Sequence, residues 1–257
     1  MLRELDKSDW LSMLRIPENF IPKVLILRGT RNLKTQYEKH KKFFQNILEV
    51  GSPNGVLEDV FIGEVKENII GYASVYGAPM ASEVTHVFGV LGSSLVIQVG
   101  CCGAIGDGIV AGDLVCATKA YRGEGASQYY FKETEHIDAS SDMVDRIKCE
   151  KLNENIKIHL GPIFTTSALF AEGRTEIESW YSKKYIAVDM ETAATFAVAK
   201  HFQMKRLSIL FAFDNPREGC HILLEETEKD NRRNCGENEM INIALKMAVE
   251  YAKTNGR

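Results

Sequence analysis

Two carboxylates that stand two residues apart, Asp189 and Glu191, lie between an apolar run and a stretch of small residues. The run over 185–188 predicts a buried strand, and the small residues predict a helix over 192–200. Ligands of open α/β sheets bind at the carboxyl ends of strands. Acids there, beside the positive end of a helix, can hold hydroxyl groups or a cation. The structural alternative is that these acids only cap the helix.

Three further apolar runs end in residues suited to binding or catalysis, which are Gly29–Arg31, Gly100–Gly103 and Asp214. Glycine-rich turns let backbone N–H groups approach an anion closely. A carboxyl group beside apolar residues can have a raised pKa and act as an acid near neutral pH. The structural alternatives are tight turns and, for Asp214, a cap on the Asn215–Pro216 turn. Because strand ends of one sheet share an edge, the four ends together favour a site.

The elements that must position these residues alternate between strands and helices, which predicts one α/β domain around a central sheet. Strands are expected over 23–28, 58–65, 69–75, 94–99, 113–121, 156–164, 185–188 and 206–213. Helices are expected over 37–48, 80–91, 140–153, 176–181, 192–200, 224–232 and 237–253. An amphipathic lead-in over 1–22 is expected to precede the domain at 23–257.

Composition excludes several classes of protein. The 257 residues are 45% hydrophobic and 26% charged, as in ordinary soluble globular proteins. A net charge of −4 without a long basic block argues against nucleic-acid binding. The cysteines form no CxxC pair and the histidines lack metal-ligand spacing, so we expect no metal site and reduced, cytoplasmic thiols. No run approaches about 18 consecutive apolar residues and the N-terminus is unlike a signal peptide, so no membrane association is expected.

Several segments resemble the nucleoside phosphorylase superfamily, which includes purine and uridine phosphorylases, AMP nucleosidase and the methylthioadenosine/S-adenosylhomocysteine nucleosidases. They are VIQVGCCGAI at 96–105, GDLVCATKAYRGEGAS at 112–127, VDMETAA at 188–194 and FDN at 213–215. The resemblance, over about 23–253, implies an α/β fold whose mixed central sheet is partly closed into a barrel and flanked by helices. It also implies cleavage of a ribosidic C–N bond through an oxocarbenium-like transition state, without a cofactor.

The resemblance also implies roles for individual residues. Glu191 would hold the ribose 2′- and 3′-hydroxyls and Met190 would pack on the sugar, with Asp189, shorter than the Glu of many members, beside them. Asp214 would protonate or hydrogen-bond N7 of a purine and so make the base a better leaving group. The other implied residues are Phe170, Gly103 and Arg174 for the base, and Gly29, Arg31, Gln98 and Cys101 for phosphate.

The implied phosphate site departs from the family pattern. Gln98 stands where phosphorylases bring an Arg, and a neutral amide lacks the bidentate, charge-assisted contact of a guanidinium. Cys101 stands where relatives have Ser or Thr, and a thiol is a weak donor. These departures favour hydrolysis. The charges of Arg28, Arg31 and Arg122 favour binding of phosphate or of a nucleotide's 5′-phosphate.

The leading hypothesis is a nucleoside phosphorylase that cleaves the N-glycosidic bond of a purine nucleoside with inorganic phosphate as co-substrate. The first alternative is a hydrolytic nucleosidase acting on a nucleoside or on a nucleotide such as AMP. The second is a catalytically silent nucleoside-binding protein. The expected partner is therefore a small-molecule nucleoside or nucleotide, and the resemblance further implies a homo-oligomer, from dimer to hexamer.

Overall fold

The structure of the protein, a computed structural model, describes residues 2–218 and 227–255. Its strands are β1 (Val24–Gly29), β2 (Gln45–Glu49), β3 (Val60–Val65), β4 (Asn68–Val75), β5 (Leu95–Ala104), β6 (Leu114–Gly123), β7 (His136–Asp138), β8 (Ile158–Thr166), β9 (Ala187–Asp189) and β10 (Lys205–Asp214). Its helices are α1 (Lys7–Leu14), α2 (Leu33–Lys41), α3 (Gly77–Leu91), α4 (Ser141–Lys148), α5 (Arg174–Ser182), α6 (Thr192–His201) and α7 (Thr227–Asn255).

All the described strands belong to one mixed sheet, part of which closes on itself. The strand order is β10-β6-β8-β9-β5-β1-β4-β3-β2, and β7 pairs with β6. Because β10 also pairs with β5, the strands β5, β9, β8, β6 and β10 form a closed barrel. The strands β1 and β4 continue the sheet in parallel, and β3 and β2 extend it in antiparallel pairs. The expected α/β fold with a partly closed mixed sheet is thus confirmed.

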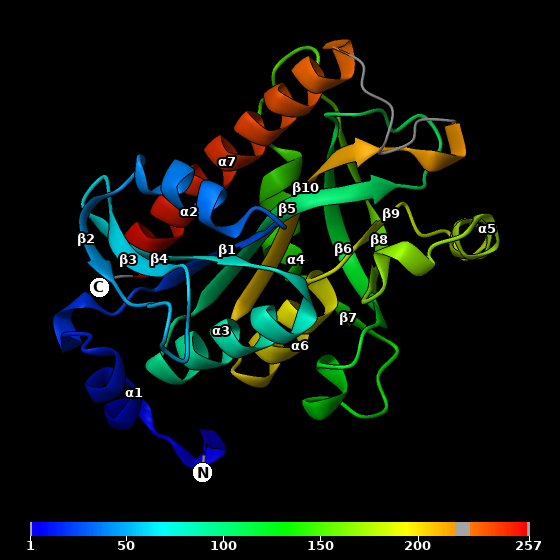
Figure 1. Ribbon diagram of the computed structural model, residues 1–257. Helices are drawn as coiled ribbons and strands as arrows, with labels where there is room; N and C mark the ends of the chain where they lie inside the picture. The colour runs from blue at the N-terminus through cyan, green and yellow to red at the C-terminus, as the bar shows by residue number, and fades with distance from the viewer. Residues whose placement is uncertain (1, 219–226, 256–257) are drawn as a thin grey trace.

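Both faces of the sheet beside β1 are covered by helices (Figure 1), with α7 on one face and α3 with α6 on the other. Side chains of β1 alternate between two apolar cores, so that Val24 and Ile26 pack on the α7 side while Leu25 and Leu27 pack on the α3 side. A strand buried on both faces needs a continuous apolar run rather than alternation. The local sequence therefore explains why β1 lies at the centre of the molecule.

Two expectations about helices are wrong. The helix expected over 37–48 ends at Lys41, and β2 follows it, because residues 45–49 pair with β3 and Phe44 packs edge-to-face on Phe61 with ring centroids 4.9 Å apart. The two helices expected at the C-terminus are one helix, α7, in the described part of the chain. Gly236 does not end it: a Cβ there would lie 2.1 Å from the Gly112 carbonyl oxygen, so this glycine permits close packing instead. Residues 224–226 of the expected helix lie outside the described residues.

The glycine-rich segment at 100–103 is not the expected turn, because β5 continues through it to Ala104. Gly100 pairs with Gly29 of β1, and a Cβ at Gly100 would lie 3.0 Å from the Gly29 carbonyl oxygen. Its glycines therefore serve close strand packing. The short strand β7 (His136–Asp138) was not expected.

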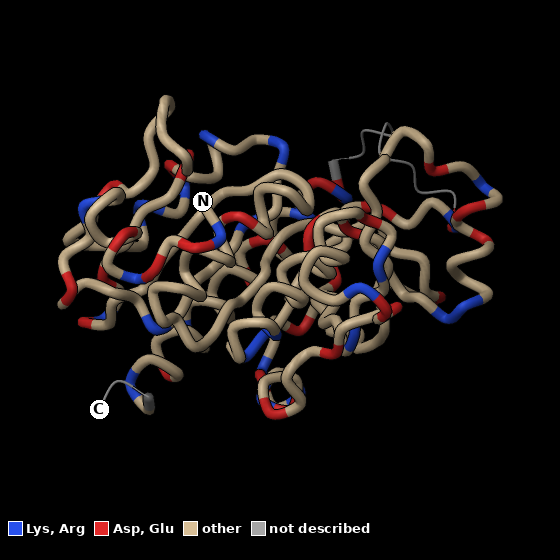
Figure 2. Tube along the Cα trace, turned by 90° about the horizontal axis from the view of Figure 1, so that it is seen from below, with Lys and Arg blue, Asp and Glu red and all other residues tan. Residues whose placement is uncertain are grey.

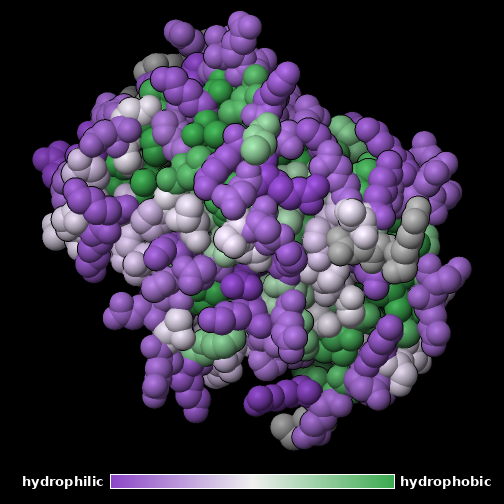
Figure 3. Space-filling view, turned by 180° about the vertical axis from the view of Figure 1, so that it is seen from behind, coloured by the Kyte–Doolittle hydropathy of each residue, from purple (hydrophilic) through white to green (hydrophobic). Residues whose placement is uncertain are grey.

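The surface carries both signs of charge, interspersed over the molecule (Figure 2). On the face opposite to that of Figure 1, hydrophobic residues reach the surface in separate patches between hydrophilic ones (Figure 3). The N-terminal helix α1 packs against α3 and buries Trp10 to 3% exposure, so the lead-in is attached to the rest of the fold. Within 2–218 and 227–255, no helix is long and apolar enough to cross a bilayer.

Candidate functional site

The four strand ends singled out in the sequence meet at one edge of the sheet, around the end of β5. Gly29 of β1 pairs with Gly100 of β5. On the other side, Gly103 of β5 pairs with Val188 of β9 and with Asp214 of β10. Because β5 lies between β1 and both β9 and β10, residues that are far apart in sequence are gathered around one strand.

Glu191 is held where β1, α3 and α6 come together. Its Oε1 accepts a hydrogen bond of 2.7 Å from the backbone N–H of Gly77, the first residue of α3, so a helix N-terminus faces the carboxylate. A Cβ at Gly29 would lie 2.6 Å from Oε2 of Glu191, so a larger residue there would displace the carboxylate from its present position. Burial, and then the charge of Asp189, raise the pKa of Glu191.

Asp189, by contrast, has both carboxylate oxygens engaged within the protein. Oδ1 accepts from Thr165 Oγ1 at 2.6 Å, and Oδ2 accepts from the backbone N–H groups of Thr192 at 2.8 Å and of Glu191 at 3.3 Å. Burial raises its pKa while these hydrogen bonds lower it, with a net rise. The capping role that the sequence left open is observed here, and the sugar contact of Asp189 and of the partly exposed Met190 stays a prediction.

Asp214 lies at the opposite side of the end of β5, partly exposed to solvent. Its Oδ1 would be 3.5 Å from a Cβ at Gly103, so the predicted base-binding glycine and the predicted acid are neighbours. The charge of Asp214 is close enough to raise the pKa of Glu172, although burial contributes more. The charge of Asp214 therefore reaches a second carboxyl group, that of Glu172.

Glu172 is a residue that the sequence-based reasoning missed. It follows the short 3-10 turn Leu169–Ala171 in the segment after β8, and it is partly buried. Burial, and then Asp214, raise its pKa to about 7. Its Oε1 is buried, with no hydrogen-bond partner in the described chain. The available signal was its place a few residues beyond a strand end, like the other candidate acids.

The predicted phosphate-binding residues Gln98 and Cys101 lie on β5 beside Gly29. Gln98 is fully buried; its Oε1 accepts from Thr195 Oγ1 of α6 at 2.9 Å, and its Nε2 would be 3.0 Å from a Cβ at Gly29. Cys101 is exposed to solvent. Solvent therefore reaches the edge at Cys101, while Gln98 connects this edge to α6.

Arg31 and Phe170 lie together at the surface beside this edge. The guanidinium carbon of Arg31 is 5.2 Å from the ring centroid of Tyr76 and 5.3 Å from that of Phe170, a distance typical of cation–π contacts. Phe170 is 92% exposed. The predicted base-binding residue thus contacts the predicted phosphate-binding residue. Arg174, at the first position of α5, is exposed.

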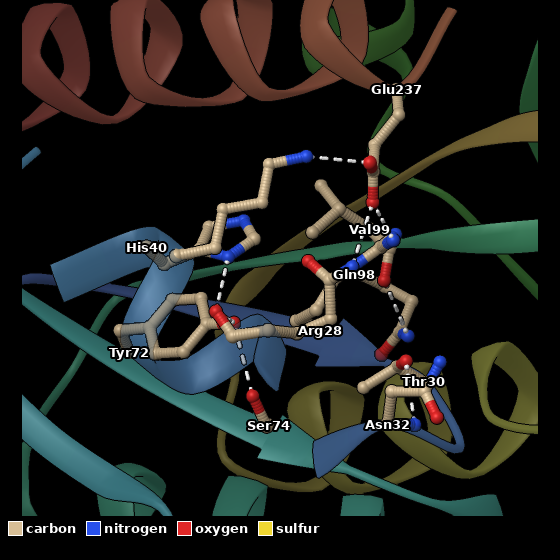
Figure 4. A network of polar contacts seen from close by, with 11 residues as sticks. Arg28, Thr30, Asn32, His40, Tyr72, Ser74, Gln98, Val99 and Glu237 are labelled. Carbon is tan, nitrogen blue, oxygen red and sulfur yellow. Dashed lines mark hydrogen bonds and ion pairs between the residues drawn. The ribbon is translucent and has the colours of Figure 1, made fainter. Parts of the chain in front are cut away.

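The other two arginines named in the sequence are engaged elsewhere. Arg122 donates to the backbone carbonyls of Phe131 and, at 3.4 Å, of Lys132. Arg28 is buried and forms an ion pair with Glu237, which reaches across from α7 (Figure 4). Because of these contacts, the guanidinium groups of Arg28 and Arg122 are less available to bind phosphate than the sequence suggested.

The ion pair of Arg28 belongs to a buried network on the α7 side of β1, shown in Figure 4. Lys39 Nζ lies 2.5 Å from Oε2 of Glu237, and Gln36 Nε2 donates to Oε1 at 3.0 Å. Burial raises the pKa of Glu237, but Arg28 and Lys39 outweigh it and the net pKa is lowered. Next to this network, His40 stacks on Tyr72 with ring centroids 4.6 Å apart.

A metal centre has no support in the residues that the structure describes, where no group of three or more His, Cys, Asp or Glu side chains is arranged to hold an ion. The chemistry available at the strand edge is that of carboxyl groups, one thiol, an amide and Arg31. Such groups can hold hydroxyls, donate or accept protons, and attract an anion.

Comparison with known proteins gives consistent matches. A model of the phosphorylase superfamily matches residues 29–246. A DeoD-type purine nucleoside phosphorylase from Geobacillus sp. (strain WCH70) is 30% identical over 159 residues, covering 62% of this chain and 65% of that protein. The one from Buchnera aphidicola subsp. Acyrthosiphon pisum (strain 5A) is 26% identical over 212 residues, covering 81% and 87%. The crystal structure of uridine phosphorylase from Vibrio fischeri ES114 superposes with a TM-score of 0.76 at 22% identity, covering 91% of this chain and 95% of that one.

Proposed function

The chain belongs to the phosphorylase superfamily, and from this membership we propose that it transfers the pentosyl group of a purine nucleoside from the base to inorganic phosphate. The observation that carries the proposal is the placement of two carboxyl groups on the two sides of the end of β5. Glu191 lies against Gly29, and Asp214 lies against Gly103. A nucleoside lying across β5 would present its sugar to Glu191 and its base to Asp214.

In this reaction the C1′–N9 bond breaks as phosphate attacks C1′, and the bonding electron pair moves to the base. Glu191 accepts hydrogen bonds from the ribose hydroxyls, and its charge stabilises the positive charge that develops on the sugar. Burial and the charge of Asp189 raise the pKa of Glu191, and the Gly77 N–H bond and the charge of Arg28 oppose that rise and favour the ionised form that this role requires. Asp214 donates a hydrogen bond or a proton to N7, so that the base leaves without a full negative charge.

The phosphate site is the part of the proposal with a specific competitor. Phosphate binding is supported by Arg31, the backbone at Gly29 and the exposed Cys101. The proposed reaction needs no cofactor. Gln98, however, brings no charge, and its amide oxygen already accepts a hydrogen bond from Thr195. That observation favours hydrolysis by water as the second candidate function.

A single experiment separates the two reactions. The purified protein is incubated with purine and pyrimidine nucleosides and with AMP, with and without phosphate, and the free base is measured by chromatography. Phosphorolysis predicts base release that requires phosphate and yields ribose 1-phosphate in equal amount. Base release that is indifferent to phosphate would replace the phosphorylase by a nucleosidase. Binding without any release would leave a nucleoside-binding protein.

Family membership supports a small-molecule nucleoside and phosphate as the binding partners. A homo-oligomer is the finer proposal; light scattering together with activity tests it, and a fully active monomer would contradict a shared site. The cysteines in the described residues (Cys101, Cys102, Cys116, Cys149 and Cys235) are free thiols, which supports a reducing compartment such as the cytoplasm.

A further inference from the structure

We propose that Tyr76 is a positioning residue that holds the guanidinium group of Arg31 in place for phosphate. Tyr76 does so through a cation–π contact rather than an ion pair, so the charge of Arg31 stays available to the anion. This inference rests on the proposed function, because it assumes that Arg31 binds phosphate. Neither the sequence motifs nor the family match singles out Tyr76.

The backbone that carries Arg31 is fixed on both sides. The N–H group of Thr30 donates to the carbonyl oxygen of Val75 at 2.9 Å, which ties the loop after β1 to the residue before Tyr76. The N–H group of Asn32 donates to Oγ1 of Thr30 at 3.1 Å (Figure 4). Because β1 and β4 are parallel neighbours that end together, Arg31 and Tyr76 extend from adjacent strand ends.

The side chain of Arg31 is held by aromatic rings. Its guanidinium carbon lies 5.2 Å from the ring centroid of Tyr76 and 5.3 Å from that of Phe170. Within residues 2–218 and 227–255, this guanidinium group forms no ion pair and no hydrogen bond. An aromatic ring attracts a guanidinium group without neutralising its charge or occupying its N–H groups. Arg31 is therefore positioned while its charge and its donors remain available to a ligand.

Arg31 and Tyr76 lie beside the carboxylate that is proposed to hold the sugar. Tyr76 immediately precedes Gly77, whose N–H group donates to Oε1 of Glu191 at 2.7 Å. Gly29, two residues before Arg31, lies against the same carboxylate. A phosphate bound by Arg31 is therefore near a sugar held by Glu191, as attack on C1′ requires.

Other candidate groups at this edge are less suited to bind the anion. Gln98 brings a neutral amide, Arg28 is paired with Glu237, and Arg122 donates to backbone carbonyls. Phosphate binding should therefore depend on Arg31 and on whatever fixes its side chain.

Tyr76 is the better of the two rings to substitute. Phe170 is 92% exposed and is also predicted to contact the base, so its loss would affect both substrates. Tyr76 occupies the N-cap position of α3, but its side chain makes no capping hydrogen bond. Its hydroxyl group has no hydrogen-bond partner in the part of the chain that the structure describes. Tyr76→Leu therefore removes the aromatic ring without removing a hydrogen bond.

The test measures the KM for phosphate and the KM for a purine nucleoside separately. Leucine is apolar but has no π-face, so Tyr76→Leu should raise the KM for phosphate by roughly 2- to 5-fold, the effect of one exposed cation–π contact. The kcat and the nucleoside KM should stay as in the wild type. Tyr76→Phe keeps the ring and should restore the phosphate KM, and Tyr129→Leu, at a tyrosine that is 81% exposed, is the matched control.

A double-mutant cycle shows whether Tyr76 acts through Arg31. Arg31→Gln removes the cation and should raise the phosphate KM by roughly 10- to 100-fold, as expected for hydrogen bonds to a charged group. Adding Tyr76→Leu to that variant should cause no further rise. The proposal would be overturned by a further rise, by an unchanged phosphate KM in Tyr76→Leu alone, or by an equal rise in the nucleoside KM.

A binding measurement separates failure of this inference from failure of the proposed function. Titration calorimetry with inorganic phosphate requires no turnover. Weaker binding in Tyr76→Leu and normal binding in Tyr76→Phe support the role of Tyr76 even if no nucleoside is cleaved. Equal phosphate affinities in the three proteins, with phosphate-dependent cleavage of nucleosides, would overturn the role of Tyr76 and leave the proposed function intact. A wild type that does not bind phosphate would overturn both.

Discussion

Two groups of charged residues, one on the α7 side of β1 and the other around the end of β5, are built differently. On the α7 side, Arg28 and Lys39 surround Glu237, and the cations lower the pKa of its carboxyl group despite burial. At the strand edge, acids gather with acids: burial and a neighbouring carboxylate raise the pKa of Glu191 and of Glu172. Burial is thus accompanied by opposite net shifts of the pKa, depending on the charges nearby.

The difference indicates what each group is for. A buried ion pair is satisfied within the protein and fixes the elements that carry it, here β1, α2 and α7. Carboxyl groups whose pKa values are raised toward neutral can exchange protons or accept hydrogen bonds from a ligand. We therefore assign stability to the Arg28–Glu237 network and chemistry to the acids around the end of β5.

The largest effect is expected from Asp214→Asn, which tests the chemical side of the comparison. Removing a general acid typically lowers turnover by about 10²- to 10⁴-fold. We expect that loss in kcat for a purine nucleoside, with little change in its Kd, as measured by base release and calorimetry. Asp145→Asn, at an exposed acid on α4, is the control and should be neutral. Unchanged turnover in Asp214→Asn would remove this residue from the mechanism.

Glu237→Ala tests the structural side. It leaves Arg28 buried without its anion, and breaking a buried pair in this way costs about 3–5 kcal/mol in the free energy of unfolding. Urea denaturation measures the loss. Glu237→Gln keeps an oxygen that accepts hydrogen bonds and should cost less. A cost for Glu237→Ala below about 1 kcal/mol, as for a surface pair, would contradict the assigned role.

The pH dependence of stability probes the same network through His40. Burial lowers the pKa of His40 from 6.5 to about 4 in the folded protein. Between these values the unfolded chain binds the extra proton, so the stability due to neutral His40 is complete above pH 6.5 and is lost as the pH falls to 4. The shift corresponds to about 3 kcal/mol.

The measurement is the unfolding free energy of the wild type minus that of His40→Gln, followed from pH 7.5 to about pH 4. Subtraction removes the opposite contributions of Glu172 and Glu191, whose raised pKa values make folding more favourable as the pH falls. A difference that does not decrease toward acid pH would show that His40 titrates normally in the folded protein.

The smallest effect is expected at an exposed ion pair, where burial does not contribute. This pair is compared with the buried pair of Arg28 and Glu237. Lys34 and Glu38 lie 3.1 Å apart on α2, and their side chains are 74% and 51% exposed. Lys34→Ala should change the unfolding free energy by less than about 0.5 kcal/mol, and added salt should reduce that further. If Lys34→Ala lowered the unfolding free energy as much as Glu237→Ala does, burial would not explain the difference between the exposed and the buried ion pair.

Much of the fold could be predicted because it depends on local pattern. The continuous apolar run of β1 and the small residues after Glu191 each determine an element from neighbouring residues alone. The elements that were missed depend on distant partners. The strand β2 forms because β3 is there to pair with it, and Gly236 lies within α7 because it packs against Gly112, where no larger residue fits.

The candidate site divides in the same way. The sequence by itself placed Asp189, Glu191 and Asp214 at strand ends, because an apolar run that stops at an acid is visible without coordinates. Only the tertiary structure distinguished Asp189, whose oxygens are taken by Thr165 and Thr192, from Glu191, which lies against Gly29. Only it brought Glu172 within reach of the charge of Asp214. The physical reason is that hydrogen-bond partners and pKa values depend on distances between segments that are remote along the chain.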